Sequence, residues 1–424
     1  MYRLRSEMYL FESYGISREL CETDRLIMER CRGQFEECEA VRDSLQLKVL
    51  DAFIRNRIGL QHMAQSTGYG YGDTGRDTFD KLFADCVGAE DALCRSSILS
   101  GTHALAVALF GLLRTGDRLL AATGRPYDTL QPVIGLTREG YGSLAEYGIT
   151  YDEVPLRDGE PDLEGITMKA GEADVVHIQR SRGYEARRAF SLDDIKKIAE
   201  AVRSVNSKAV ILVDNCYGEF TDHDEPLKAG ADLIAGSLIK NPGGGIAPTG
   251  GYIAGRKDLV ERCGHRLTAP GTGRELGSNP GGMREYYLGL YYAPHVTCEA
   301  KKTSIYASAL FEEIGYRTVP DYTAPRNDII TSIETGSPEN LIALCEEIQA
   351  ASPVDSFASP VPDDMPGYDD KIIMAAGAFT QGSSIELSCD GPLREPYIAY
   401  LQGGISLAGS RLALLHAAER MRKN

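Results

Sequence analysis

Apolar and polar positions follow two alternating periods along the middle of the chain. From about residue 77, short apolar runs typical of strands are separated by stretches with the spacing of amphipathic helices. This succession favours an α/β domain with a mainly parallel sheet and helices on both faces. The strands are expected near residues 91–95, 118–122, 150–154, 173–178, 209–213 and 251–253, and the helices near 77–87, 104–113, 128–135, 162–170 and 191–204.

The two ends of the chain show different patterns. Segment 17–58 matches a long helix with Ser17 as its N-cap, and 284–318 is largely helical with a break or kink at Pro294. The remainder alternates again, with strands expected near residues 329–333, 371–375 and 384–387 and a last helix over 405–421. The predicted domains are an N-terminal helical arm with an adjoining loop (1–76), a large α/β domain (77–283), a connecting helical segment (284–318) and a small α+β domain (319–424).

Composition mainly excludes classes of function. With 424 residues, 43% of them hydrophobic and 25% charged, the chain has the make-up of a soluble globular protein with room for two domains. A net charge of −16 disfavours nucleic acid as a partner, because phosphate contacts need a basic surface. No apolar run approaches the roughly 18 residues of a membrane span. Ten scattered cysteines without metal-ligand spacing indicate a reduced, cytoplasmic protein without a metal site.

A lysine beside a glycine run carries the strongest chemical signal. Lys240 follows the apolar segment 231–235 and precedes the triple glycine 243–245, which lets backbone approach a bound group closely. On its own, such a lysine is usually a solvated surface residue. Upstream, however, Asp214 stands at the end of an apolar strand. A lysine that can form a Schiff base and an acid that can pair with a pyridinium nitrogen are what pyridoxal phosphate requires of its protein.

The segment before the helix at 104–113 is a candidate phosphate site. Ser100, Gly101 and Thr102 precede this helix, whose first backbone amides form an anion cradle. An ordinary N-capped helix explains the motif better when it is taken alone. Ser237 would add a hydroxyl from the other side of the same phosphate.

The stretch 66–76 is dense in glycine and tyrosine and too irregular for a helix or a strand. A flexible surface loop explains it as well as an anion site does. As an anion site, Tyr71 would supply a phenol and Arg76 a guanidinium to the same phosphate, from a neighbouring subunit.

Three residues match the remaining needs of the cofactor. Tyr127 follows a predicted strand and would stack on the ring. Asp214, which could equally cap a helix or a turn, would keep the ring nitrogen protonated. Lys240, desolvated and near other positive groups, would have a lowered pKa and act first as nucleophile and later as base.

In this order the motifs resemble those of fold-type I pyridoxal-phosphate enzymes. Within that class the chain is similar to the cystathionine/methionine lyase group of Cys/Met metabolism, and more specifically to its methionine gamma-lyase-like "aluminium resistance" branch. The resemblance implies the fold-type I transferase fold, and a homodimer or homotetramer whose subunits share active sites. The matching stretches are 68–76, 177–184, 237–245 and 382–392.

The resemblance also implies a β- or γ-elimination on a sulfur-containing or related amino acid. Lys240 would hold the cofactor as an aldimine, be displaced by the amino group of the substrate and then remove its Cα proton. A thiolate would leave, and Tyr127 would protonate it. Hydrolysis would then give ammonia and an α-keto acid.

The chain departs from the lyase pattern at three places. The arginine that the lyases carry two residues after the loop tyrosine comes later here, at Arg76, and Ile239 replaces a threonine that supplies a phosphate hydroxyl. Glu386 stands where the lyases have the arginine that clamps the substrate carboxylate. The remaining candidates for this clamp are Arg394, Arg180 and Arg182, each equally explained as a surface arginine.

Two alternative functions stay open at this point. Transamination, decarboxylation or side-chain exchange would use the same lysine and aspartate. A non-catalytic phosphate-binding protein would use the glycine run alone, although the chain lacks a G-x-x-x-x-G-K-[ST] motif. No cluster of metal ligands gives the aluminium label a physical basis.

Overall fold

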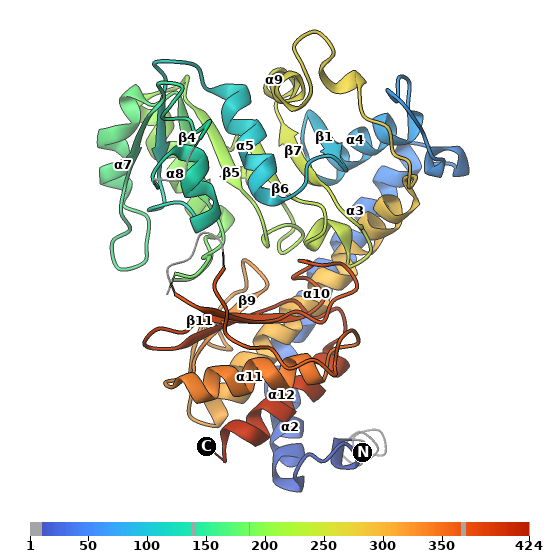
Figure 1. Cartoon of the computed structure of the whole chain (residues 1–424), viewed down its shortest axis with the longest axis vertical. Helices are drawn as coiled ribbons and strands as arrows, with labels where there is room; N and C mark the ends of the chain where they lie inside the picture. Colours follow the sequence, from blue (N-terminus) through green and yellow to red (C-terminus); the bar gives the residue numbers. More distant parts are fainter. Residues whose placement is uncertain (1–10, 138–140, 186, 366–369, 424) are drawn as a thin grey trace. The chain divides into compact units, whose positions relative to one another are not determined.

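The computed structural model describes residues 11–137, 141–185, 187–365 and 370–423. They form two compact units (Figure 1). The large unit is Ser44–Ala293, and the small unit combines the described residues of Met1–Asp43 and Pro294–Asn424. The division falls inside two helices, α3 (Arg32–Arg55) and α10 (Arg284–Glu313), whereas the sequence placed boundaries at 76, 283 and 318. The first ten residues of the predicted arm lie outside the described ones.

The large unit is built on a seven-stranded sheet in the order β1-β7-β6-β5-β4-β2-β3. Strand β7 is antiparallel to both of its neighbours, so β1 and β6 run in the same direction, and the remaining pairs are parallel. The prediction of a mainly parallel sheet is confirmed. The strands are β1 Asp91–Arg95, β2 Arg118–Ala121, β3 Thr150–Glu153, β4 Val175–Gln179, β5 Val210–Asp214, β6 Leu233–Ser237 and β7 Gly251–Gly255.

Helices cover both faces of this sheet, as the strand–helix alternation predicted. On one face, α5 (Gly101–Leu112) and α9 (Lys257–Leu267) share an apolar core with the sheet, including Ile253 of β7. The preceding side chain of β7, Tyr252, points to the opposite face of the sheet and packs on Phe83, with ring centroids 4.7 Å apart. Residues on both faces are therefore buried, which is why the central strands are continuous apolar runs rather than alternating ones. Phe83 belongs to α4 (Thr74–Val87). Two further helices of this unit are α7 (Leu163–Lys169) and α8 (Leu192–Val205).

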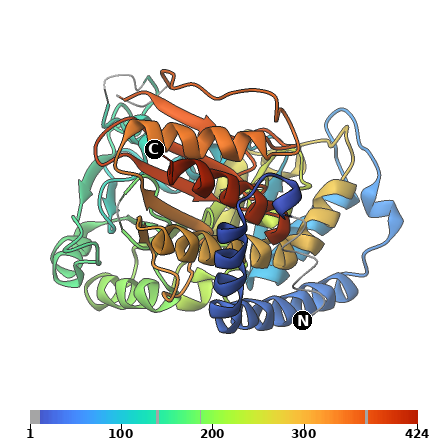
Figure 2. The same cartoon turned by 90° about the horizontal axis from the view of Figure 1, so that it is seen from below.

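The small unit contains a five-stranded antiparallel sheet in the order β10-β11-β12-β9-β8. Helices α11 and α12 of this unit lie side by side (Figure 2) and share one apolar core with the sheet. The predicted small α+β domain is confirmed in class. Its elements are α2 Arg18–Arg30, β8 Arg317–Val319, β9 Ile330–Glu334, α11 Pro338–Ala350, β10 Ile372–Ala375, β11 Ser388–Pro392, β12 Ile398–Gln402 and α12 Leu407–Met421.

One strand prediction in the small unit is wrong. Residues 384–387 form a turn, and the strand begins only at Ser388. The buried carboxylate of Glu386 accepts the backbone N–H groups of Phe379 and Thr380, at 2.8 and 3.0 Å. This side chain therefore folds the segment back on itself before the strand starts.

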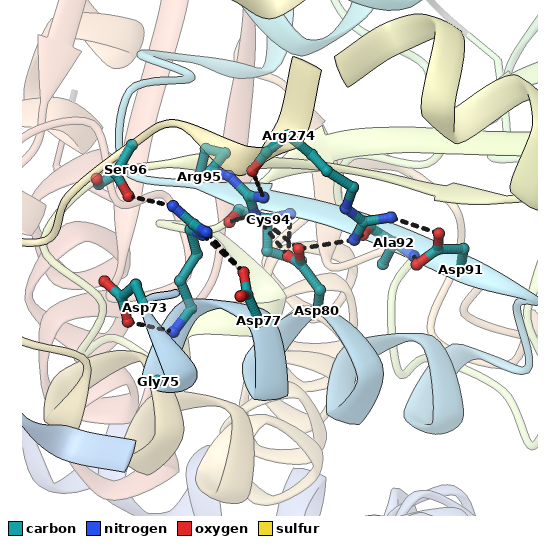
Figure 3. A network of polar contacts seen from close by, with 12 residues as sticks. Asp73, Gly75, Asp77, Asp80, Asp91, Ala92, Cys94, Arg95, Ser96 and Arg274 are labelled. Atoms are coloured by element: carbon teal, nitrogen blue, oxygen red, sulfur yellow. Dashed lines mark hydrogen bonds and ion pairs between the residues drawn. The ribbon is translucent and has the colours of Figure 1, made fainter. Parts of the chain in front are cut away.

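A buried ion-pair network joins three segments of the large unit (Figure 3). Asp80 on α4 accepts hydrogen bonds of 2.8 Å from the backbone N–H of Cys94, from Arg95 and from Arg274. Arg274 also donates to Asp91 at the start of β1. Asp80 and Arg95 are both buried, so their charges persist in the interior only because each has its partners. The network fixes α4 and β1 to the segment around residue 274.

Three further properties of the described residues bear on the composition argument. None of their helices combines the length and the apolar character needed to span a membrane. They contain no group of three or more His, Cys, Asp or Glu side chains placed to hold a metal ion. All ten cysteines are free thiols and buried.

The network makes Asp80→Ala strongly destabilising. The substitution leaves the buried Arg95 guanidinium without its carboxylate, which costs about 3–5 kcal/mol in comparable buried pairs. Urea unfolding of the full chain measures the loss. The control is Asp258→Ala, which removes an exposed partner of Arg256 and costs less than about 1 kcal/mol. Equal losses in the two variants would contradict the importance of the network.

Candidate functional site

The predicted cofactor residues gather at one edge of the large sheet. Asp214 is the last residue of β5 and Ser237 the last residue of β6, the neighbouring parallel strand. Gln179 ends β4 and pairs directly with Asp214. Lys240 follows Ser237 by three residues. In open α/β sheets, ligands bind outside the carboxyl ends of the strands, and this is the edge where these residues lie.

The amino end of α5 meets the same edge. Helix α5 begins at Gly101, and the hydroxyl of Ser100 caps it by accepting the N–H of His103 at 3.0 Å. A Cβ added at Gly101 would lie 2.9 Å from the Cys216 thiol sulfur and 3.8 Å from Ser237 Cβ. Glycine therefore keeps open the space where the helix amides, Ser237 and the turn after β5 converge. Backbone amides at a helix start attract anions.

Tyr127 is held in place by contacts with residues that were not individual candidates from the sequence. Its backbone N–H donates to the side-chain oxygen of Gln179 at 2.7 Å. A Cβ added at Gly183 would come within 2.8 Å of Tyr127 Cδ2, so the tyrosine ring packs directly on this glycine. The hydroxyls of Thr102 and Thr129 are 2.6 Å apart and link the Tyr127 loop to the start of α5. Tyr127 therefore lies beside both the anion cradle and the end of β4.

Lys240 has an electrostatic environment opposite to the one expected. Its Nζ lies 3.7 Å from the centroid of the Tyr217 ring. Burial acts to lower the pKa of Lys240, but Tyr217, Cys216 and Asp214 outweigh burial and raise this pKa above its ordinary value. The predicted lowering was wrong, because the neighbours are a phenol, a thiol and a carboxyl rather than positive groups.

The pKa of Asp214 is also raised, and for a different reason. Burial raises the pKa of its carboxyl, and the backbone N–H of Cys216, which donates to it at 3.1 Å, and the charge of Lys240 offset part of this effect. The surrounding groups of the protein therefore only partly stabilise a negatively charged Asp214 carboxylate. A cationic group from a ligand would supply the missing compensation.

The turn after β5 is held from two sides. The guanidinium of Arg180 donates to Asn215 Oδ1 and to the Gly218 carbonyl, both at 2.8 Å. The side-chain amide of Asn241 donates to the carbonyls of Tyr217 and Glu219, at 3.0 and 2.9 Å. Asn241, the residue next to Lys240, is thus hydrogen-bonded to the turn that begins at Asp214. No local pattern in the sequence indicated this contact.

Arg180 and Arg182, two of the proposed carboxylate clamps, are both fully buried. The contacts of Arg180 go to the protein, which does not support a role on the substrate. Arg394, the third candidate, is exposed in the small unit and pairs with Asp370 at 3.1 Å. Its role on the substrate stays a prediction.

The two predicted phosphate ligands of segment 66–76 differ in exposure. The prediction that the whole segment is irregular was wrong, because its last three residues begin α4 at Thr74. Tyr71 is 65% exposed, whereas Arg76 is 1% exposed. Arg76 donates to the carbonyls of Gly70 and Gly277, at 3.0 and 2.9 Å, and so supports the loop from beneath. Contact of either side chain with a neighbouring subunit's phosphate stays a prediction.

Glu219 is an unusual acid beneath this site. Burial raises the pKa of its carboxyl to about 8, and the hydroxyl of Tyr252 donates to it at 2.7 Å. The carboxyl is therefore mainly protonated at neutral pH. Its other oxygen has no hydrogen-bond partner among the described residues.

Glu219→Gln is expected to flatten the pH dependence of stability. The pKa of this carboxyl is 4.5 ordinarily and about 8 in the folded chain, so between these values the folded state binds the extra proton. Its contribution to the free energy of unfolding is therefore greatest below pH 4.5 and falls as the pH rises to 8, by at most about 1.4 kcal/mol per pH unit.

Urea unfolding across this range tests the expectation. The wild-type protein should lose stability relative to Glu219→Gln as the pH rises. Glu200→Gln, at an exposed position of α8, serves as the matched control and should follow the wild type. Parallel pH profiles for wild type and Glu219→Gln would refute the shifted pKa.

Comparison with known proteins places the whole chain among relatives. It is 43% identical over 392 residues to the uncharacterized protein YnbB of Bacillus subtilis, covering 92% of this chain and 93% of the relative. The crystal structure of a carbon–sulfur lyase involved in aluminum resistance from Clostridium novyi is 48% identical, with a TM-score of 0.93, and covers 97% of this chain and 98% of that one.

More distant structures share the fold alone. The pyridoxal-5'-phosphate-dependent protein YhfS of Escherichia coli is 17% identical, with a TM-score of 0.61 over 90% of this chain and 96% of that one. Cystathionine gamma synthase of Xanthomonas oryzae is 16% identical, with a TM-score of 0.58 over 85% and 92%. These neighbours confirm the predicted fold class. The family model described as Methionine gamma-lyase matches residues 21–422, and the chain therefore belongs to the methionine gamma-lyase family.

Proposed function

We propose that the chain is a pyridoxal-phosphate-dependent carbon–sulfur lyase that eliminates a thiolate from the β- or γ-carbon of a sulfur-containing amino acid and yields ammonia and an α-keto acid. The observation that carries the proposal is Lys240 beside Asp214 at the carboxyl edge of the parallel sheet, with the amino end of α5 facing them. The family match and the similarity to a carbon–sulfur lyase support the same reaction class.

The residues at this edge fit the cofactor. Any side chain at position 101 would fill the space beside the first amides of α5, because a Cβ added there would lie 2.9 Å from the Cys216 sulfur. This open space beside helix amides suits a phosphate. At the other end, the raised pKa of Asp214 marks a buried carboxyl that a protonated ring nitrogen would compensate.

Each part of the cofactor has a matching group in the chain. Ser100, Gly101, Thr102 and Ser237 would bind the phosphate through backbone amides and hydroxyls, and Tyr127 would stack on the ring. Asp214 would pair with the ring nitrogen, and Lys240 would carry the cofactor covalently. When bound, pyridoxal phosphate supplies an electron sink for the pair left at the substrate α-carbon.

Side chains of the protein carry out the proton transfers of the proposed reaction. Lys240 Nζ takes the proton from the α-carbon of the substrate. For a γ-elimination a second proton leaves the β-carbon. Lys240 would be the base again, after it has passed the first proton to the bound cofactor and regained its free amine. The Tyr127 hydroxyl would protonate the departing thiolate, since a tyrosine ring stacked on the cofactor would lie near the substrate.

We also assign a homodimer or homotetramer to the active protein. The tyrosine-rich loop at 66–76 would reach a neighbouring subunit's phosphate through Tyr71. The exposure of Tyr69 and Tyr71 supports this arrangement, because large aromatic side chains on a braced loop are typical of contact surfaces.

Lys240→Ala tests the function directly. The wild-type protein, mixed with pyridoxal phosphate, should gain a visible absorbance band and release ammonia and an α-keto acid from sulfur amino acids such as cystathionine or methionine. Lys240→Ala should lose the turnover by at least about a thousandfold, since its side chain is both the covalent anchor and the base.

Lys257→Ala, at an exposed position of α9, is the matched control and should retain both the band and the turnover. Turnover by Lys240→Ala at the wild-type rate would refute the proposal. If the product forms only when a second keto acid is added, the reaction is a transamination and not an elimination.

A further inference from the structure

The ring of Tyr217 lies face-on to the amino group of Lys240. Nζ is 3.7 Å from the ring centroid, well inside the distance at which an ammonium is attracted by an aromatic face. Tyr217 stands in the turn after β5, three residues beyond Asp214. Neither the sequence motifs nor the proposed binding of the cofactor gives this side chain a task.

The backbone at Tyr217 is held in an unfavourable conformation. Its φ is +71°, in the left-handed region that non-glycine residues rarely adopt. The two clamps described above, from Arg180 and Asn241, fix the turn on either side of this residue. Non-glycine residues in this region persist where the surrounding structure imposes them, and such positions cluster at functional sites. Here the imposed backbone directs the ring at Lys240.

We propose that Tyr217 is a catalytic residue whose ring face holds and stabilises the ammonium form of Lys240 during proton transfer from the substrate. The inference rests on the proposed role of Lys240 as base. In that step the Cα–H bond breaks, an N–H bond forms at Nζ, and the electron pair stays with the substrate. The new cation forms against the ring, which attracts it but cannot take its proton.

The other groups facing Nζ are less suited to this task. They are Asp214, Cys216 and Glu219, all on the same end of β5 and the following turn. Asp214 is reserved for the ring nitrogen of the proposed cofactor. Burial raises the pKa of the Cys216 thiol well above its ordinary value and that of Glu219 to about 8, so both are mainly neutral near pH 7. Tyr217 therefore remains as the partner of the lysine charge, through its ring face at 3.7 Å and through a side-chain hydrogen bond that also raises the pKa of Lys240.

The test is the proton affinity of Lys240 in the full chain freed of cofactor. Competitive acetylation with acetic anhydride, read by mass spectrometry of the peptide that contains Lys240, gives the labelling rate as a function of pH. The midpoint of this profile reports the pKa, and its plateau reports accessibility. Wild type is compared with Tyr217→Leu, which removes the ring, and Tyr217→Phe, which keeps it.

Tyr217→Leu should shift the Lys240 profile to lower pH by about one unit, the size of a desolvated cation–ring interaction. Tyr217→Phe should shift it by less than half as much. Lys257 in the same digests is the internal reference, and Tyr147→Leu, at an exposed tyrosine, is the matched control variant; neither should change.

Three results would overturn the inference. The Leu profile could coincide with that of the wild type, it could differ in plateau height alone, or the Phe variant could shift as far as the Leu variant. Because Tyr217→Phe keeps the ring and most of its volume, it tests the inference even if Tyr217→Leu fails to fold. The visible band of wild type with pyridoxal phosphate is recorded in parallel, so a failure of the proposed function is seen separately from the labelling result.

Discussion

The side-chain amide of Asn241 is the contact on which the candidate site depends. It donates to two carbonyls of the turn that follows β5, and it is adjacent to Lys240. The lysine and the turn with Asp214 and Tyr217 therefore form one rigid assembly, although they are separated in sequence. The arrangement has a cost, because Asn241 Oδ1 is buried without a hydrogen-bond partner among the described residues. Such local costs are expected where geometry serves a site rather than stability.

Buried arginines perform a similar task elsewhere in the large unit. Arg180 donates to the carbonyl of Gly218 in the turn after β5, and Arg76 donates to the carbonyls of Gly70 and Gly277. A guanidinium suits this role because it has five donors in a fixed plane and stays charged when buried. From sequence, both arginines resembled ligands for anions. In the structure they shape the segments that carry the neighbouring functional groups.

Much of the fold was predictable because its signals are local. The strand predicted at 209–213 and found at Val210–Asp214, and with it the sheet class, follow from apolar runs that a buried parallel sheet requires. The proximity of Lys240, Asp214 and Gly101 was likewise predictable, since Asp214 ends an apolar strand, Lys240 follows an apolar segment and Gly101 precedes a helix. Their binding of a cofactor stays a prediction. The roles of Tyr217, Gln179 and Asn241 were not predictable, because they arise from contacts between segments that only the folded chain brings together. The turn at 384–387 was missed for the same reason: a carboxylate bonding to two amides overrides an apolar pattern.

The charges around Lys240 are linked, and this linkage separates the roles of the two nearby acids. A positive Lys240 lowers the pKa of both Asp214 and Glu219, while burial raises both. When Lys240 carries the proposed cofactor and loses its free ammonium, both carboxyls lose that stabilisation. The ring nitrogen of the proposed cofactor would give Asp214 a new cation, whereas Glu219, with a pKa of about 8, is already neutral and needs none. In the proposed function only Asp214 would respond to the cofactor, and the released lysine would take up its proton against the ring of Tyr217.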